Sequence, residues 1–239
     1  MKTLSIAIII TAMLCTGCKK EAATNNKPKT YLLSKKTFNL NNSYIMYETY
    51  SYDDKNRVIE IKESSNRNDY KYTYDNSNNL IVAKTYDFNN TLTSTANYTY
   101  SGNTVSVLEL YGDGTVKSAY TFTLDINQKV TSTTLDGSDI FTYDSNGNIT
   151  HYDQTGPTTQ SDSYTYDNKK HPLSMIGAKN IHMMFLLGEP QTFINNVVQE
   201  QDQPNNYSYV YNNDGFPTSA VDKGIAGIST TITYEYITK

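Results

Sequence analysis

The chain has 239 residues and a formal net charge of −4, with 20 basic and 24 acidic side chains. This mild acidity gives no electrostatic basis for binding nucleic acid, so we predict no nucleic-acid partner. The sequence contains 22 tyrosines and no tryptophan. Tyrosine and threonine favour strands, whereas asparagine, aspartate and glycine favour turns, so the composition predicts an all-β protein.

The first 18 residues have the pattern of a secretory signal. Lys2 precedes the apolar run Leu4–Leu14, which is too short to cross a bilayer as a helix. The run ends at Leu14-Cys15-Thr16-Gly17-Cys18, which resembles a bacterial lipoprotein signal, although Cys15 stands where an aliphatic residue is usual. The resemblance implies that residues 1–18 are a signal peptide ending at a lipidated Cys18. The alternative is an ordinary secretory signal with incidental cysteines.

Cysteine usage limits the chemistry of the mature chain. Both cysteines lie in or at the end of the signal, so we predict neither a disulfide nor a cysteine-bearing metal site. Residues 19–30 are polar and indicate a flexible tether. Within them, Lys19-Lys20-Glu21 resembles the charged signals that send some Bacteroidota lipoproteins to the cell surface. We therefore predict a protein held by lipid at the outer membrane, on its periplasmic or its surface-exposed face.

A repeat of two aromatic residues, two positions apart, fills most of residues 31–239, which we predict to be one β domain. The first aromatic position is held by Tyr50, Tyr72, Tyr98, Phe122, Phe141, Tyr164, Tyr209 and Tyr234, and the second by Tyr52, Tyr74, Tyr100, Leu124, Tyr143, Tyr166, Tyr211 and Tyr236. A period near twenty residues or a little more indicates one repeated supersecondary unit. The interval from Tyr166 to Tyr211 is about twice as long, which fits either two units or one unit with an insertion.

Each unit has the pattern of a β-hairpin. Residues two apart in a strand share a face, so the aromatic pair lies on one side and the intervening threonine or serine on the other. An aspartate usually follows, at positions 53, 75, 125, 144 and 167, and can initiate a turn by accepting a backbone N–H two residues on. Gly147 and Asn79 suit left-handed backbone near the end of the turn. About fourteen to sixteen strands are predicted, as an antiparallel meander.

Two resemblances follow from these residues. The unit Tyr143-Asp144-Ser145-Asn146-Gly147-Asn148 resembles the YD repeat of rearrangement-hotspot and teneurin-type proteins. The segment Tyr166–Leu173, together with Asn195-Asn196-Val197-Val198 and Tyr209–Pro217, is similar to an uncharacterised family of Bacteroidota lipoproteins. The resemblance implies an antiparallel, curled or barrel-like sheet of hairpins. It implies no catalytic residue.

Residues 174–203 interrupt the repeat. They contain the most apolar run of the mature chain, Ile181–Leu187, which is too short to cross a membrane. We predict that this insertion covers or plugs the tyrosine-lined face, either as a core plug, which contiguous apolar residues favour, or as a lid that gates a ligand. The face opposite the tyrosines is rich in Thr, Ser, Lys and Asn, which does not fit a transmembrane barrel.

No catalytic or metal-binding pattern is present. The histidines His151, His171 and His182 lack metal-ligand spacing, and Asp144–Asn148 lacks the closing glutamate of a calcium loop. No phosphate-binding loop, nucleophile elbow or Cys–His pair occurs. We therefore predict no catalytic residue, no metal and no cofactor.

Three functions remain open. The first is a non-catalytic binding module for a glycan or an envelope protein, because tyrosine rings and polar loop groups suit sugars. The second is a structural or assembly scaffold without a small-molecule ligand. The third is a glycosidase, which would require two carboxyl groups in a deep cleft, about 5 to 9 Å apart.

Overall fold

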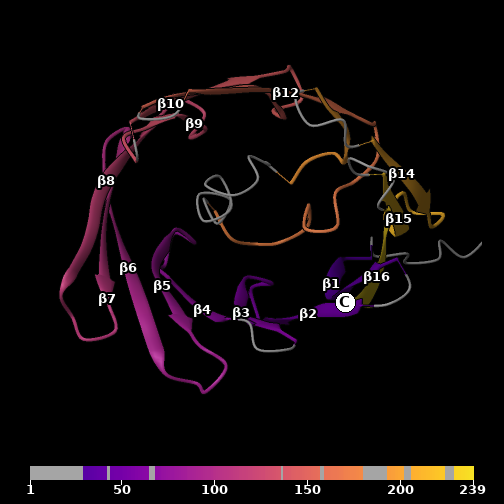
Figure 1. Cartoon of the computed structure of the whole chain (residues 1–239), viewed down its shortest axis with the longest axis horizontal. Helices are drawn as coiled ribbons and strands as arrows, with labels where there is room; N and C mark the ends of the chain where they lie inside the picture. The colour runs from indigo at the N-terminus through magenta and orange to yellow at the C-terminus, as the bar shows by residue number, and fades with distance from the viewer. Residues whose placement is uncertain are drawn as a thin grey trace, which may run out of the picture.

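A computed structural model describes residues 29–41, 44–64, 68–135, 137–156, 159–179, 193–201, 206–223 and 229–239. These residues form sixteen strands in a closed barrel in which every strand pairs antiparallel with its neighbours (Figure 1). The strands are β1 (Tyr31–Leu40), β2 (Tyr44–Tyr52), β3 (Val58–Glu63), β4 (Asp69–Tyr74), β5 (Leu80–Tyr86), β6 (Leu92–Ser101), β7 (Thr104–Tyr111), β8 (Val116–Leu124), β9 (Val130–Thr133), β10 (Ser138–Tyr143), β11 (Ile149–Thr155), β12 (Gln160–Tyr166), β13 (Val197–Glu200), β14 (Asn206–Tyr211), β15 (Pro217–Lys223) and β16 (Ser229–Thr238). The predicted all-β antiparallel meander of hairpins is confirmed. Within these ranges no helix is long and apolar enough to cross a membrane.

Strands β1 and β16 close the barrel. Their register runs from Tyr31 opposite Thr238 to Leu40 opposite Thr230. Beyond it, Thr30 and Lys239 exchange two backbone hydrogen bonds of 3.0 Å. The sequence left open whether the sheet is curled or barrel-like, and the pairing of its first and last strands makes it a barrel. Closure removes the unpaired strand edges that an open sheet exposes to aggregation.

The two ends of the barrel differ. The insertion end holds Thr30, Lys239 and the turns at residues 53–57, 75–79, 125–129, 144–148 and 212–216, together with the described residues 167–179 and 193–196 of the long connection. The opposite end holds the connections between successive hairpins, such as residues 87–91. The long connection joins β12 directly to β13. The doubled repeat interval is therefore one unit with an insertion, and β13 shortens the predicted insertion 174–203 at its C-terminal side.

The aromatic pairs face the interior, as predicted. First-position side chains are buried on six consecutive units: Tyr50, Tyr72, Tyr98, Phe122, Phe141 and Tyr164. The residues between the two aromatic positions are exposed, and most of them are polar: Ser51, Thr73, Thr99, Thr142, Thr165 and Val210. The apolar core is thus the inside of the barrel, and its outer wall is mainly polar, with exposed apolar side chains such as Leu108, Ile140 and Val210.

Second-position tyrosines link each hairpin to the hairpin before it. The Tyr74 hydroxyl donates to the Val58 carbonyl oxygen at 2.6 Å. Between β3 and β4 the described backbone ladder ends at Glu60 opposite Lys71. The Val58 carbonyl, which accepts from Tyr74, lies two residues beyond this end of the ladder. The same contact joins Tyr52 to Leu33, Tyr100 to Leu80, Tyr143 to Val130, Tyr166 to Ile149 and Tyr236 to Pro217.

Leu124 occupies the second position without a hydroxyl, and its surroundings explain why none is needed. The ladder between β7 and β8 extends to Thr104 opposite Thr123, and the Leu124 N–H donates to the Asn103 carbonyl at 2.7 Å. The preceding hairpin, β6–β7, has no register shift. Here the backbone itself makes the connection that a tyrosine makes elsewhere.

Apart from β6–β7, the hairpins whose turns lie at the insertion end have a β-bulge at the start of their second strand. Tyr52 pairs with Val58 but Ser51 pairs with Glu60, which leaves Ile59 as the extra residue. The same shift occurs in β4–β5, β8–β9, β10–β11, β12–β13 and β14–β15. A bulge bends its strand and increases its twist. This bend separates adjacent hairpins at the insertion end, where the tyrosine hydroxyls then bridge them.

The turns confirm Gly147 as a left-handed residue, with φ of 97°, but the prediction for Asn79 was wrong. The left-handed residue there is Asn78, with φ of 69°. Asn79 instead donates its backbone N–H and its Nδ2 to the carboxylate of Asp75, at 2.8 and 2.9 Å. Its side chain therefore caps the turn, and the residue before it adopts the unusual backbone.

Removing one hydroxyl of the tyrosine series is expected to destabilise the barrel. In Tyr74→Phe the ring stays in place under the Arg57 guanidinium, 4.9 Å from the ring centroid, but the Val58 carbonyl loses its donor. An acceptor left unsatisfied in this way costs about 1–3 kcal/mol of unfolding free energy. The urea midpoint of Tyr74→Phe should fall clearly below that of Tyr111→Phe, whose side chain is half exposed. Equal midpoints would contradict a structural role for the hydroxyl.

Candidate functional site

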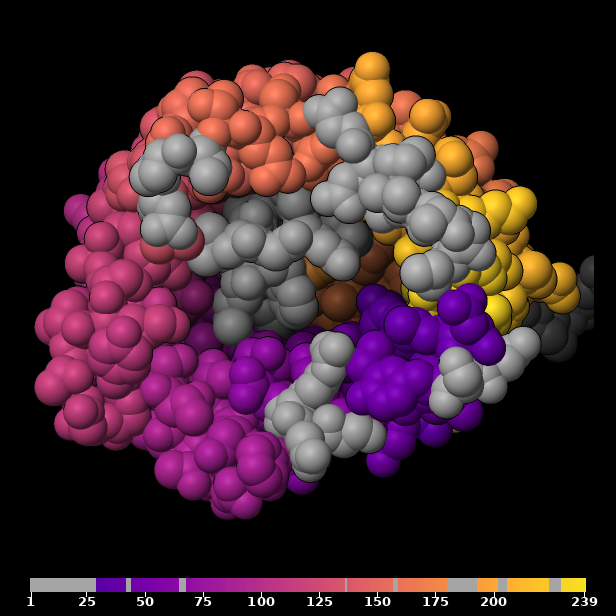
Figure 2. All heavy atoms as spheres, in the orientation of Figure 1, coloured from indigo at the N-terminus to yellow at the C-terminus, as the bar shows by residue number. Residues whose placement is uncertain are grey.

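A cavity of about 620 Å³ lies inside the barrel. Its walls come from β1–β4 on one side and β13–β16 on the other. Figure 2 shows a hollow between these indigo and yellow strands, with orange atoms of the long connection deeper inside. Barrels of sixteen or more strands are too wide for inward side chains alone to fill. The cavity is the part of the interior that the core and the insertion leave empty.

Tyrosine rings make up much of the wall. Among the described residues, seven of them line the cavity: Tyr47, Tyr50, Tyr70, Tyr72, Tyr207, Tyr209 and Tyr234. Tyr207 and Tyr209 lie nearly parallel, with ring centroids 6.5 Å apart and planes inclined by 27°. Burial, with the nearby Glu48 carboxylate, raises the pKa of Tyr50 well above its ordinary value. The tyrosines offer the cavity both flat apolar faces and hydroxyl groups.

Four charged side chains also face the cavity: Lys36, Glu48, Glu63 and Asp222. Alternation along the strands places them there. In β2, Glu48 follows the same face as Tyr50, and the Tyr50 hydroxyl donates a short hydrogen bond to Glu48 Oε2. Glu48 lies directly opposite Lys36 in one ladder and opposite Glu63 in the other. Among the described residues, the lining therefore combines aromatic faces with three carboxylates and one ammonium group.

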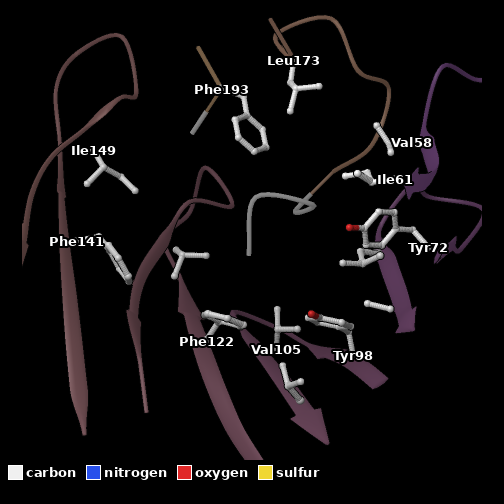
Figure 3. Close-up of a cluster of buried hydrophobic side chains, with 14 of the residues drawn as sticks. Val58, Ile61, Tyr72, Tyr98, Val105, Phe122, Phe141, Ile149, Leu173 and Phe193 are labelled. Carbon is white, nitrogen blue, oxygen red and sulfur yellow. The ribbon is translucent and has the colours of Figure 1, made fainter. Parts of the chain in front are cut away.

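The long connection forms the floor of the cavity at the insertion end. Leu173 and Phe193 are buried, and Figure 3 shows both pointing into the same core as Tyr72, Phe122 and Ile149. The Phe193 ring stacks on His171 with centroids 5.0 Å apart. Phe193, which lies in the predicted insertion, and Leu173, which directly precedes it, thus pack into the barrel core, while the choice between a plug and a lid stays a prediction. The apolar run Ile181–Leu187 and His182 lie outside the described residues.

Asn196 completes this floor. Its backbone N–H and its Nδ2 donate to Asp167 Oδ1 and Oδ2, at 3.1 and 3.0 Å, and Tyr211 also donates to Asp167 Oδ2. The side chain is 1% exposed, and its Oδ1 finds no hydrogen-bond donor among the described residues. A buried amide oxygen without a donor is uncommon in proteins and calls for an explanation.

The aspartates of the hairpin turns accept hydrogen bonds within their own turns. Asp144 Oδ1 accepts the N–H groups of Gly147 and Asn148 at 2.7 and 2.9 Å, and Oδ2 accepts Asn148 Nδ2 at 2.9 Å. Burial acts to raise the pKa of Asp144, but these hydrogen bonds outweigh it and hold the pKa below its ordinary value. The carboxylate is therefore fixed as an acceptor within its own turn. Across the described residues, no three His, Cys, Asp or Glu side chains are placed to hold a metal ion.

His151 belongs to a polar network on the outer wall. Its Nδ1 lies 2.9 Å from Ser163 Oγ and its Nε2 lies 3.0 Å from Asp153 Oδ2, while Ser161 Oγ donates to Asp153 Oδ1 at 2.9 Å. The four residues are cross-strand partners on β11 and β12. From the sequence we noted only that His151 lacks metal-ligand spacing, and the network was missed. Its signal is the i, i+2 spacing of His151 and Asp153 on one strand and of Ser161 and Ser163 on the next.

Sequence reasoning also missed the charged part of the cavity. Glu48 lies two residues before Tyr50, Glu63 two residues after Ile61, and Asp222 two residues after Ala220. Because each shares a strand face with a buried residue, the alternation alone could have assigned all three to the interior.

No family model and no curated protein matches the chain. Among solved structures, a porin-like protein from Bacteroides uniformis matches with a TM-score of 0.52 and 15% identity, over 86% of this chain and 96% of that chain. A porin-like protein from Bacteroides vulgatus matches with a TM-score of 0.43 and 10% identity, over 87% of this chain and 99% of that chain. The first of these matches shows that the barrel fold is shared with a Bacteroides protein.

Proposed function

We propose that this protein is a non-catalytic binding module of the bacterial cell envelope, held at the outer membrane by lipid on Cys18, which takes a glycan into its barrel cavity. The observation that carries the proposal is the cavity itself. Its volume falls in the range of small-ligand sites in proteins. A concave site of this size inside a barrel suits a small ligand rather than the surface of a folded protein.

The wall of the cavity supports a glycan ligand. Sugar rings present flat C–H faces edged by hydroxyl groups, and a tyrosine offers an apolar face with a polar tip. Tyr70, Tyr207 and Tyr234 line the cavity without being fully buried. Glu48, Glu63 and Asp222 add acceptors for hydroxyl groups.

The outer wall supports a barrel that lies beside the membrane and is tethered to it. Lys62, Lys71 and Lys84 are exposed on consecutive strands of that wall. A lysine facing lipid at the bilayer midplane costs about 2–4 kcal/mol in known barrels. Thr30 leaves the barrel at the insertion end, so a tether of residues 19–30 would turn this end toward the membrane. The fold shared with a Bacteroides porin-like protein supports an envelope location and the resemblance to Bacteroidota lipoproteins.

Glycoside hydrolysis is a second candidate, favoured by one observation. Glu48 and Glu63 are direct cross-strand partners and both face the cavity. Retaining glycosidases hold two carboxyl groups about 5–5.5 Å apart on either side of the scissile bond. If the protein hydrolyses an oligosaccharide, and if both Glu48→Gln and Glu63→Gln abolish this activity, glycoside hydrolysis replaces the binding proposal.

The proposal is tested by thermal shift of the full-length protein in detergent against a panel of oligosaccharides. A ligand at ten times its Kd stabilises the native state by about 1.4 kcal/mol, which corresponds to about 3–6 °C for a domain of this size. Tyr70→Leu, which removes a ring from the cavity wall, should abolish the shift. The matched variant Tyr111→Leu, on an exposed tyrosine, should keep it.

Two results would contradict the proposal. The absence of a shift with every saccharide would favour the scaffold function instead. For the location, Cys18→Ser should release the protein from the membrane fraction, and a variant that stays membrane-bound would refute the lipid anchor.

A further inference from the structure

We propose that the insertion end of the barrel contacts an anionic bilayer surface through a patch of two isoleucines and three lysines. This tether-end patch consists of Ile126, Lys129, Lys169, Lys170 and Ile194. The inference rests on the lipid anchor of the proposed function and adds the face of the barrel that the anchor brings to the membrane. It is carried by the exposure, the continuity and the position of these side chains.

The two isoleucines of the patch project out of the barrel. Ile126 is the most exposed large apolar side chain among the described residues, at 89%, and lies in the turn at residues 125–129. Ile194 is 37% exposed, although the preceding Phe193 is buried in the core. Water hydrates such aliphatic groups unfavourably, whereas the boundary between headgroups and acyl chains accepts them. Both side chains therefore suit contact with a bilayer.

Ile194 and Lys129 meet over one hairpin turn. Ile194 Cδ1 and Lys129 Nζ both lie 3.0 Å from the position that a Cβ on Gly147 would take. The two side chains thus cover the turn at residues 144–148. Lys129 ends the turn that carries Ile126, so apolar and cationic groups alternate along this part of the barrel end.

The same surface continues to the point where the chain enters the barrel. Asn195 donates its Nδ2 to the Lys169 carbonyl at 2.7 Å, and the Lys170 Nζ lies 4.9 Å from the centroid of the Phe216 ring. That ring stacks on Tyr31, with centroids 4.9 Å apart. Tyr31 is the first residue of β1, so the patch borders the exit of the tether.

The lysines carry the outermost charges of the patch. Lys169 and Lys170 are exposed, whereas the aspartates of the same turns are half-buried and accept backbone N–H groups at this end of the barrel: Asp125, Asp144 and Asp167. The aspartates equal the lysines of the patch in number. Attraction to an anionic surface therefore acts at short range, through the long lysine side chains that reach the headgroups.

The tether selects this end of the barrel. Thr30 pairs with Lys239 at the insertion end, and residues 19–30 span at most about 40 Å when fully extended. A lipid on Cys18 therefore keeps the patch close to the bilayer, and this confinement raises the local concentration of lipid surface. The patch orients a protein that the lipid already holds, because so few side chains bind a membrane only weakly by themselves.

The opposite end offers the competing surface. Phe88 and Val116 are each 64% exposed there, and Tyr111 is 52% exposed. The tether does not leave the barrel at that end, so contact of these side chains with the bilayer would require the tether to run along the barrel wall. The two ends can be compared directly in one experiment.

The test reads the depth of a fluorescent label at each end. Asn127→Cys places a thiol beside Ile126, and Asn89→Cys places one beside Phe88. The two turns are matched, because each asparagine is exposed and donates its backbone N–H to the aspartate two residues before it, at 2.8 and 2.9 Å. Both native cysteines lie in or at the end of the signal. In the processed and acylated protein the introduced thiol is therefore the one that takes the label.

Each labelled full-length protein is reconstituted into vesicles of phosphatidylethanolamine and phosphatidylglycerol with a quencher on the acyl chains just below the headgroup. We expect the label at residue 127 to be quenched at least about twofold more than the label at residue 89. Replacing phosphatidylglycerol by phosphatidylcholine should reduce this difference, because the lysines then lose their anionic partners.

One variant tests the apolar contact. Ile126→Asp, combined with the Asn127→Cys label, should remove most of the extra quenching, because a carboxylate does not enter the interfacial region. The side chain is almost fully exposed, so the thermal midpoint should stay unchanged and show that the variant folds.

A second pair of variants tests the charge. The patch variant combines Lys129→Gln, Lys169→Gln and Lys170→Gln and should lower the quenching in anionic vesicles severalfold. The control removes the same charge from exposed lysines of the outer wall, with Lys62→Gln, Lys71→Gln and Lys84→Gln, and should leave the quenching unchanged.

The outcomes separate this inference from the proposed function. A protein that does not associate with vesicles refutes the lipid anchor and the inference together. Stable association with equal quenching at both labels, or with more at residue 89, overturns the inference and leaves the anchor and the glycan cavity in place. Equal quenching in anionic and neutral vesicles, or an equal loss in the outer-wall control, overturns the recognition of anionic lipid by the patch.

Discussion

Replacing Phe122 by alanine is expected to destabilise the protein by about 3–5 kcal/mol, because it leaves a void in a close-packed interior. Phe122 is 0% exposed. Its ring meets Tyr120 edge to face, with centroids 5.6 Å apart and planes inclined by 82°, and Val105 lies opposite it in the β7–β8 ladder. Figure 3 shows it beside Val105, on the side of the cluster away from Leu173 and Phe193. The surrounding strands are held by backbone ladders and cannot move in to fill the space.

The measurement is the thermal midpoint, which should fall by about 6–20 °C for a domain of this size. Phe88→Ala is the matched control, because it removes the same side chain from a turn residue that is 64% exposed. Its unfolding free energy should change by less than about 0.5 kcal/mol. A small effect of Phe122→Ala would mean that the barrel interior is loosely packed and that the aromatic repeat is not its core.

The aromatic repeat could be predicted because its information is local. Alternation along a strand decides which side chains share a face, and the polar residue between Tyr72 and Tyr74 is enough to assign both rings to the interior. The hydrogen bond of Tyr74 to Val58 could not be predicted in this way, because it depends on the bulge at Ile59 and on where the ladder to β4 ends. Leu124 shows the same limit, since its lack of a hydroxyl is explained by how far the β7–β8 ladder extends, to Thr104 opposite Thr123.

The left-handed residue of the turn at residues 75–79 was assigned wrongly, although a comparison with another repeat unit would have identified it. Asn78 and Asn79 are adjacent, and either residue tolerates left-handed backbone. In the unit of Asp144, the left-handed Gly147 stands three residues after the aspartate and the capping Asn148 four residues after it. Aligning the two units by their aspartates places Asn78 with Gly147 and would have given the correct residue.

Neither the closure of the barrel nor the size of its cavity could be predicted from local sequence patterns. Closure depends on pairing Tyr31 with Thr238 across nearly the whole chain, and no local pattern fixes that register. The cavity depends on how much of the wide interior the insertion fills, which is set by the path of residues 167–179 and 193–196. The residues that line it were nevertheless readable, because Glu48, Glu63 and Asp222 all follow the inward alternation of their strands.

The path of the insertion is fixed by close backbone contacts across the barrel end, and Gly177 is the tightest of them. The Gly177 N–H donates to the Asn56 carbonyl at 2.9 Å, and the Lys179 N–H donates to the Asn78 carbonyl at 2.8 Å. A Cβ added to Gly177 would lie 2.2 Å from the Lys55 carbonyl oxygen. The three atoms nearest to that Cβ are all backbone atoms of Lys55 and Asn56, so no flexible side chain can move away.

Gly177→Ala is therefore expected to push the insertion off the turns at residues 53–57 and 75–79, at a cost of about 1–3 kcal/mol. The amides of Gly177 and Lys179 should lose protection from hydrogen exchange, because their acceptors lie on those turns. Ser174→Ala is the control, since Ser174 is exposed on the same segment and its replacement should change neither exchange nor stability.

The same variant separates a plug from a lid. Leu173 lies in the core cluster with Val58 and Tyr72, so a plug that unfolds with the barrel would lower the global midpoint together with local protection. A lid would show faster exchange over the segment at an unchanged global midpoint, because local opening is then independent of unfolding. The burial of Leu173 and Phe193 leads us to expect the first result, which would leave the opposite end of the barrel as the route by which a ligand enters.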